Sequence, residues 1–165
     1  MVRPLVEVLV ESARASGLRL AVAESCTGGM IASALTDAPG ASRVLDCGFV
    51  TYSDAAKRAL LGVTEASLTA HGAVSEPVAR EMALGALARS EADIALAVTG
   101  IAGPGGSEHK PEGRVCFALA RRADADAAPT ATTETVDFGP LGRDGVRRAS
   151  LAHALRRLAE AVRPG

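Results

Sequence analysis

The chain has 165 residues and a formal net charge of −1, with 48% hydrophobic and only 2% aromatic residues. The near-neutral charge disfavours nucleic-acid binding through a basic patch. The three cysteines have no CxxC spacing, which disfavours both a disulfide framework and a zinc site. Because no charge-free stretch is long enough for a membrane helix, we expect one cytoplasmic domain over residues 1–165, without a metal or a membrane segment.

The first part of the chain alternates between helical and strand patterns. Apolar residues at helical spacing predict a helix at 2–16, followed by a short buried strand at 18–24. A second helix is expected at 30–38 and a second strand at 43–51, interrupted by a glycine. The segment 53–62 then predicts a helix whose N-cap is the serine or aspartate at its start.

The next part of the chain contains the clearest helix and the clearest strand. A short helix is expected at 64–70, and a serine followed by a proline in the first turn predicts a longer helix at 75–90. The apolar run 93–100 is typical of a strand that is buried on both faces. The composition of residues 101–113 predicts a loop.

The last part of the chain predicts two strands and an amphipathic helix. The strands are expected at 114–122 and 130–138, arranged as a hairpin, and the helix at 142–162. The segment 123–131, ADADAAPTA, is expected to be a disordered loop. Helices alternating with strands indicate an α/β fold in which a mixed, mostly parallel sheet has helices on both faces.

Three segments follow predicted strands, at the sheet edge where ligands bind in open α/β folds. They are ESCTGG (24–29), TYSDAAK (51–57) and TGIAGPGGS (99–107). The N–H groups of Gly28 and Gly29 can face an anion or an oxyanion, or these glycines simply permit a tight turn. The spacing matches neither GxxxxGK[ST] nor GxGxxG, which disfavours a nucleotide triphosphatase and a dinucleotide oxidoreductase.

Ser25 is a candidate nucleophile, because N–H groups of the following turn can form an oxyanion pocket. Lys57 is the candidate base, although an exposed helix lysine is the alternative interpretation. Only two of the 18 basic residues are lysines, which favours a specific role for each. Cys26 is an alternative nucleophile but has no neighbouring cation to form a thiolate. His71 and His109 are expected at structural or solvent-exposed positions, and His153 is expected on the surface of the last helix.

Four motifs occur in order: AESCTGG, GFVTYSDAAK, HGAVSE and VTGIAGPGGSEHKPEG. Together they resemble the C-terminal domain of the CinA (competence/damage-inducible) proteins, over about residues 5–160. Stand-alone members of that family are nicotinamide-nucleotide amidohydrolases, which convert nicotinamide mononucleotide to nicotinic acid mononucleotide and ammonia. The resemblance implies the same hydrolysis here, with a small pyridine nucleotide as substrate, no cofactor and a homodimer.

The resemblance also implies roles for individual residues. The family's catalytic serine and lysine match Ser25 and Lys57, and Tyr52 would lie near this pair. The family's TGIAGP loop helps to enclose the nucleotide, and the arginine of its GDR segment, which would meet the phosphate, falls on Arg143. The substrate-binding residues expected on this basis are Thr27, Gly28, Gly29, Thr99, Gly100, Gly103 and Arg143.

The expected mechanism has Ser25 Oγ attack the carboxamide carbon while neutral Lys57 takes its proton. This requires that burial or nearby positive charge lower the pKa of Lys57. Two alternatives stay open. A CinA-like domain with the short GPGGS loop can bind a pyridine nucleotide or a protein without hydrolysing anything, and a cysteine hydrolase would use Cys26 instead.

Overall fold

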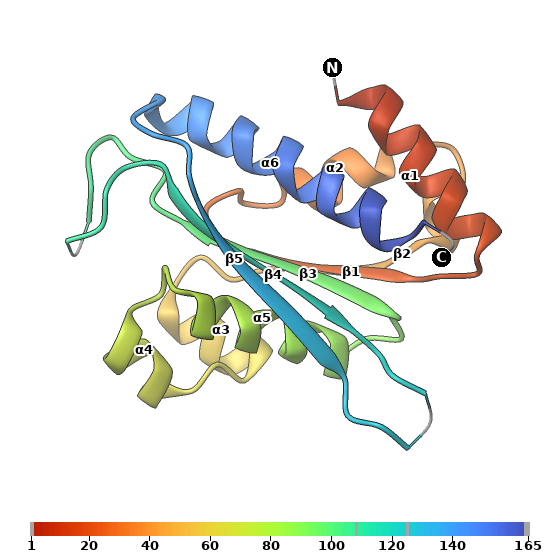
Figure 1. Ribbon diagram of the computed structural model, residues 1–165, viewed down its shortest axis with the longest axis horizontal. Coiled ribbons are helices and arrows are strands. Elements are labelled where there is room, and N and C mark those ends of the chain that lie inside the picture. Colours follow the sequence, from red (N-terminus) through yellow and green to blue (C-terminus); the bar gives the residue numbers. More distant parts are fainter. Residues whose placement is uncertain (1, 108, 125, 164–165) are drawn as a thin grey trace.

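The computed structural model describes residues 2–107, 109–124 and 126–163, and these form one sheet with helices on both faces (Figure 1). The five strands lie in the order β2-β1-β3-β4-β5. Their bounds are Leu20–Glu24 (β1), Leu45–Val50 (β2), Ile94–Gly100 (β3), Arg114–Arg121 (β4) and Thr130–Asp137 (β5).

The sheet is mixed, as predicted, but parallel and antiparallel pairs are equally represented. β1 pairs in parallel with β2 and with β3, whereas β3–β4 and β4–β5 are antiparallel. The prediction of a mostly parallel sheet is therefore slightly off. The helical crossovers between the first three strands impose parallel pairing, and the direct β4–β5 connection imposes the antiparallel hairpin.

The helices form two layers. In Figure 1, α1, α2 and α6 lie above the sheet, and α3, α4 and α5 lie below it. Each layer closes its own apolar core against the sheet. The bounds are Arg3–Ala15 (α1), Met30–Thr36 (α2), Asp54–Leu61 (α3), Glu65–His71 (α4), Glu76–Ala88 (α5) and Gly142–Ala161 (α6), with a 3₁₀ turn at Ala41–Arg43. No helix in the described ranges is long and apolar enough to cross a bilayer.

Several element boundaries differ from those predicted. The 3₁₀ turn occupies the start of the predicted strand 43–51, so β2 begins only at Leu45. Gly48 does not interrupt β2, because its missing side chain lets the strand pack closely against α2 and β1. Thr130 and Ala131 belong to β5 rather than to a disordered loop, since they pair with β4. Residue 125 of that predicted loop lies outside the described residues.

In the lower helical layer, α3 packs tightly against α5. Ser53 is the N-cap of α3 and accepts a hydrogen bond from the N–H group of Ala56 at 3.0 Å. At the other end of α3, Gly85 of α5 packs directly on the backbone. A Cβ atom built at Gly85 would lie only 1.9 Å from the carbonyl oxygen of Leu61. This close approach fixes the position of α3, which carries Lys57.

Candidate active site

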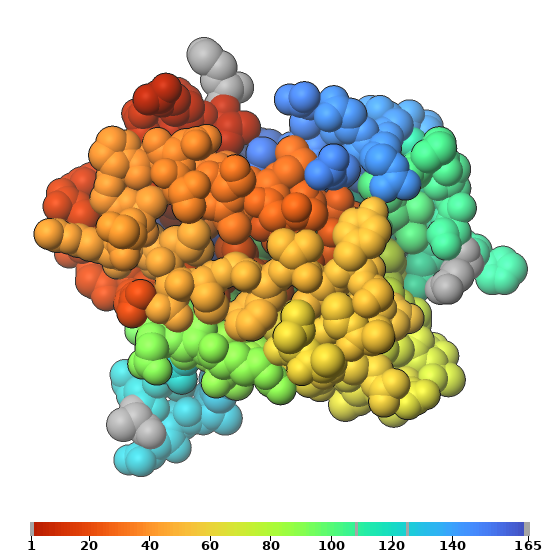
Figure 2. All heavy atoms as spheres, turned by 180° about the vertical axis from the view of Figure 1, so that it is seen from behind, coloured from red at the N-terminus to blue at the C-terminus, as the bar shows by residue number. Residues whose placement is uncertain are grey.

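Ser25 and Lys57 meet at the carboxyl end of β1. Ser25 follows β1 directly, and Lys57 lies in α3, which follows β2. The Lys57 Nζ atom donates hydrogen bonds to Ser25 Oγ at 2.9 Å and to the carbonyl oxygen of Thr51 at 2.8 Å. Lys57 is 1% exposed and Ser25 is 8% exposed. Figure 2 shows the side of the molecule on which the orange segment with α2 and β2 meets the yellow segment with α3.

Burial favours the neutral form of the Lys57 amine. Removal from water lowers the pKa of Lys57, and the nearby groups of Asp54 and Cys26 oppose this only in part. The expected contribution from a neighbouring positive charge is not among the causes. An amine that is neutral and within hydrogen-bond distance of a hydroxyl can accept its proton, which is the requirement for a general base.

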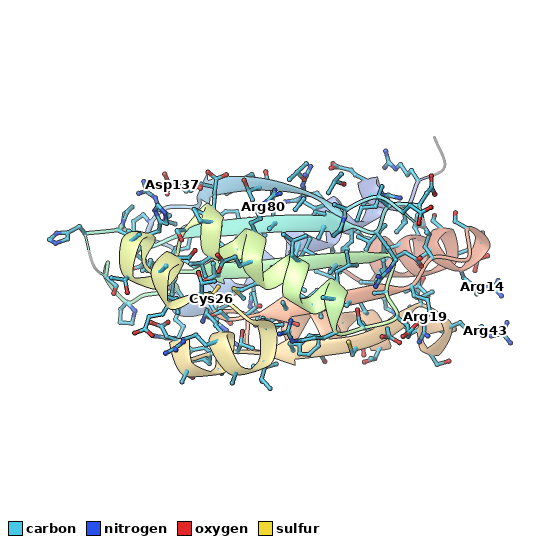
Figure 3. All side chains as sticks on the ribbon, turned by 90° about the horizontal axis from the view of Figure 1, so that it is seen from below. Arg14, Arg19, Cys26, Arg43, Arg80 and Asp137 are labelled. Atoms are coloured by element: carbon cyan, nitrogen blue, oxygen red, sulfur yellow. The ribbon has the colours of Figure 1, made fainter. Side chains whose placement is uncertain are left out.

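The same environment disfavours the thiol of Cys26 as a nucleophile. Burial raises the pKa of Cys26 to about 12, and a hydrogen bond from the Cys26 backbone and the charge of Arg147 offset this only in part. The thiolate is the reactive form of cysteine. At neutral pH the side chain is therefore a protonated, buried thiol. In Figure 3, Cys26 lies toward the opposite end of the molecule from Arg14, Arg19 and Arg43.

A cavity of about 320 Å³ opens beside the Ser25–Lys57 pair. Its wall combines the turn after β1, the β2–α3 connection, residues 73–74 and the loop 99–107. Tyr52 and Arg143 also line it, and Arg143 Nη1 donates to Tyr52 Oη at 3.1 Å. A cavity of this size, with a buried hydroxyl at one point of its wall and an exposed arginine at another, suits a small polar ligand that carries an anionic group.

The structure brings together most of the predicted site residues. Five of them line the cavity beside Ser25 and Lys57: Tyr52, Thr99, Gly100, Gly103 and Arg143. Thr27, Gly28 and Gly29 are not among the lining residues. The N–H group of Gly28 donates to the carbonyl oxygen of Ser25, and that of Gly29 donates to the Glu24 carboxylate. These two glycine N–H groups are therefore used inside the protein.

None of the histidines lines the cavity. His71 ends α4, and its carbonyl oxygen accepts a hydrogen bond from Lys110 Nζ. His153 was expected on the surface, but it is half-buried: Nε2 lies 3.0 Å from a Glu134 oxygen, and the ring packs on Phe117. The lower side of α6 faces the sheet at this point, which explains the difference.

Comparison with known proteins decides the family. The family model for the CinA C-terminal domain matches residues 2–162 of the sequence.

The chain belongs to the CinA C-terminal domain family.

Its relatives include both long and short proteins. A putative competence-damage inducible protein of Symbiobacterium thermophilum is 56% identical over 142 residues, which are 84% of this chain and 33% of that protein. The chain spans about a third of the length of the first curated relatives that it matches. The nicotinamide-nucleotide amidohydrolase PncC of Escherichia coli K12 is 47% identical over 155 residues, 93% of this chain and 90% of that protein.

A solved structure has the same fold over nearly the whole chain. The competence/damage inducible protein CihA of Agrobacterium tumefaciens has a TM-score of 0.90 and 44% sequence identity. The match covers 98% of this chain and 94% of that one. The CinA-type architecture is thus shared along the described residues, including the sheet edge at which Ser25 and Lys57 meet.

Sequence reasoning missed four residues that build the site from outside the cavity. The buried Glu24 carboxylate accepts hydrogen bonds from three N–H groups at the start of α2, at 2.9–3.1 Å. Arg147 of α6 contacts the turn after β1. Glu112 accepts hydrogen bonds from the N–H groups of Gly105 and Gly142, and Lys110 donates to the carbonyl oxygens of His71 and Val74. The scarcity of lysines in the sequence was a signal for Lys110. Nothing in the sequence pointed to Glu24, Glu112 or Arg147.

Proposed function

We propose that the chain hydrolyses the carboxamide of nicotinamide mononucleotide to nicotinic acid mononucleotide and ammonia. The observation that carries this proposal is the 2.9 Å hydrogen bond between buried Lys57 and Ser25 at the wall of a nucleotide-sized cavity. The name of the E. coli relative, which aligns over 90% of its length, supports the choice of substrate.

The reaction follows from the positions of these two side chains. Ser25 Oγ attacks the carboxamide carbon and gives its proton to the neutral Lys57 amine. The tetrahedral intermediate collapses, the C–N bond breaks, and the leaving nitrogen takes the proton from Lys57 and departs as ammonia. Water then attacks the acyl-enzyme ester and gives a proton to Lys57. The bond between the acyl carbon and Ser25 Oγ breaks, Ser25 Oγ takes the proton back from Lys57, and the acid product leaves and ionises to the carboxylate.

The far side of the cavity suits the rest of the substrate. Arg143 and Tyr52 lie at the exposed part of the lining, where they can bind the phosphate group. The loop 99–107 covers the space between this end and the Ser25–Lys57 pair. In this arrangement the pyridine ring enters toward Ser25, and the nucleotide phosphate stays near solvent.

A coupled ammonia assay with nicotinamide mononucleotide tests the proposal. Ser25→Ala should abolish ammonia release while nucleotide binding, measured by calorimetry, persists. Lys57→Arg keeps a positive charge but removes the base, and should lower kcat by at least about 100-fold. Arg148→Gln, on the exposed side of α6, is the matched control and should behave as the unmodified chain.

Two results would contradict the proposal. Ammonia release that Ser25→Ala leaves unchanged would remove the serine from the mechanism. Tight binding of the mononucleotide by the unmodified chain, with no ammonia released, would instead show a nucleotide-binding module that does not hydrolyse its ligand.

A further inference from the structure

The turn after β1 uses most of its backbone N–H groups inside the protein. That of Ser25 donates to the Val98 carbonyl oxygen at 3.0 Å, that of Gly28 to the Ser25 carbonyl oxygen at 3.1 Å, and that of Gly29 to Glu24. Two N–H groups of the turn differ. Within the described ranges, that of Thr27 has no hydrogen-bond acceptor, and that of Cys26 lies near its own thiol, a weak acceptor.

Arg147 holds the carbonyl oxygens of two peptide groups of this turn. It lies in α6, and its Nε donates to the Cys26 carbonyl oxygen and its Nη2 to the Thr27 carbonyl oxygen, both at 3.2 Å. In a planar trans peptide the N–H and C=O bonds point in opposite directions. The N–H group of Thr27, which shares a peptide with the Cys26 carbonyl, therefore points away from the guanidinium.

The guanidinium also acts through its charge. The charge of Arg147 reaches the turn, because it is one of the influences that lower the pKa of the Cys26 thiol against the larger effect of burial. The guanidinium lies beside Gly28: a Cβ atom built there would be in ordinary van der Waals contact with Arg147 Nη2, at 3.5 Å.

We propose that Arg147 is a positioning residue: it holds the Cys26 and Thr27 carbonyl oxygens and so fixes the turn whose Cys26 N–H group, at the cavity wall, binds the oxyanion formed when Ser25 attacks. The inference rests on the proposed amidase function for the identity of the acyl group. It assigns an oxyanion donor to the turn next to the nucleophile, and it separates two arginines of α6 by role. Arg143 binds substrate, and Arg147 acts only through the turn.

The test compares Arg147→Met and Arg147→Lys with the control Arg148→Met, whose side chain pairs with Asp144 on the exposed side of α6. Ammonia release should show kcat about 10- to 100-fold lower for Arg147→Met with KM within about threefold, because an oxyanion contact acts on the transition state. Arg147→Lys, which keeps the charge and can donate to one carbonyl, should recover part of kcat. Arg143→Met should mainly raise KM.

A second reaction separates this inference from the choice of substrate. A fluorophosphonate probe transfers its phosphonyl group to Ser25 Oγ; the serine proton passes to Lys57, and fluoride leaves. The labelling rate should fall in Arg147→Met by a factor similar to that in kcat, because the phosphonyl oxygen also gains negative charge. Added guanidinium ion at millimolar concentration should restore part of the labelling rate in Arg147→Ala.

The outcomes are distinguishable. If the unmodified chain is labelled normally but releases no ammonia, the proposed substrate is refuted. Slow labelling of the Arg147 variants would in that case still support the role of Arg147. Arg147→Met with a lower Tm but an unchanged kcat and labelling rate per folded molecule would overturn the inference, because the contact would then be only structural. Absence of both labelling and turnover in the unmodified chain would overturn both proposals.

Discussion

The thiol of Cys26 should be almost unreactive although it lies beside the proposed nucleophile. Burial raises its pKa from an ordinary value of 9.0 to about 12, which reduces the thiolate fraction at pH 8 by about 1,000-fold. Thiolates of higher pKa are more nucleophilic. With a Brønsted coefficient of about 0.4–0.5, each Cys26 thiolate should react about 20-fold faster than an ordinary thiolate, which offsets part of the lower thiolate fraction. Alkylation should therefore be about 50-fold slower than that of an ordinary thiol, before the limited access to a 4% exposed side chain is counted.

Iodoacetamide at pH 8 provides the assay, with alkylation of each cysteine peptide followed by mass spectrometry. Cys47 is the internal reference because it is only half-buried, although burial also raises its pKa. Cys47 should be alkylated well before Cys26, with ammonia release preserved, and Cys26→Ala should stay active. The reasoning would be refuted if Cys26 reacted as fast as Cys47 and activity disappeared in parallel, since this is the behaviour of a cysteine hydrolase.

Three further changes test how the site is built. Burial lowers the pKa of Lys57 below its ordinary value of 10.5, so between its pKa in the folded chain and its pKa in the unfolded chain the folded chain binds fewer protons. The free energy of unfolding should fall as pH decreases through that interval, kcat should fall as pH decreases below the pKa of the folded chain, and urea unfolding of Lys57→Met should lack the pH dependence. Glu24→Ala leaves three N–H groups at the start of α2 without their acceptor and should lower the free energy of unfolding by about 3–5 kcal/mol; an unchanged urea midpoint would contradict this. Gly85→Ala places a Cβ atom 1.9 Å from the Leu61 carbonyl oxygen, so it should cost about 3 kcal/mol or more and weaken catalysis by displacing α3; a Tm equal to that of the parent would show that α5 shifts freely.

The positions of the two central residues could be predicted because strand ends are local features of the sequence. An apolar run followed by a polar, glycine-containing segment places Ser25 at a strand tip, and a serine N-cap places Lys57 in the first turns of the next helix. The burial of Lys57 could not be read in the same way. It depends on how closely α3 packs against α5, which the distant Gly85 permits.

The supporting contacts were not predictable because they join segments that are far apart in the chain. Arg147 reaches a turn about 120 residues earlier, and no spacing rule connects a helix arginine to a strand-end carbonyl. The glycine pair after Ser25 had two interpretations, and the sequence could not choose between them. In the structure, the Glu24 carboxylate accepts a hydrogen bond from the N–H group of Gly29. The protein's own carboxylate therefore occupies the anion-binding position that the glycine motif suggested for a ligand.

The central claim is that Ser25 becomes acylated by a substrate carboxamide while Lys57 accepts its proton. The most direct measurement is acid quenching during turnover of nicotinamide mononucleotide, followed by mass spectrometry of the peptide that contains Ser25. We predict a nicotinoyl-nucleotide ester on Ser25 in the unmodified chain and its absence in Ser25→Ala, which should also release no ammonia. An acyl group found on another residue, or continued turnover by Ser25→Ala, would contradict the account.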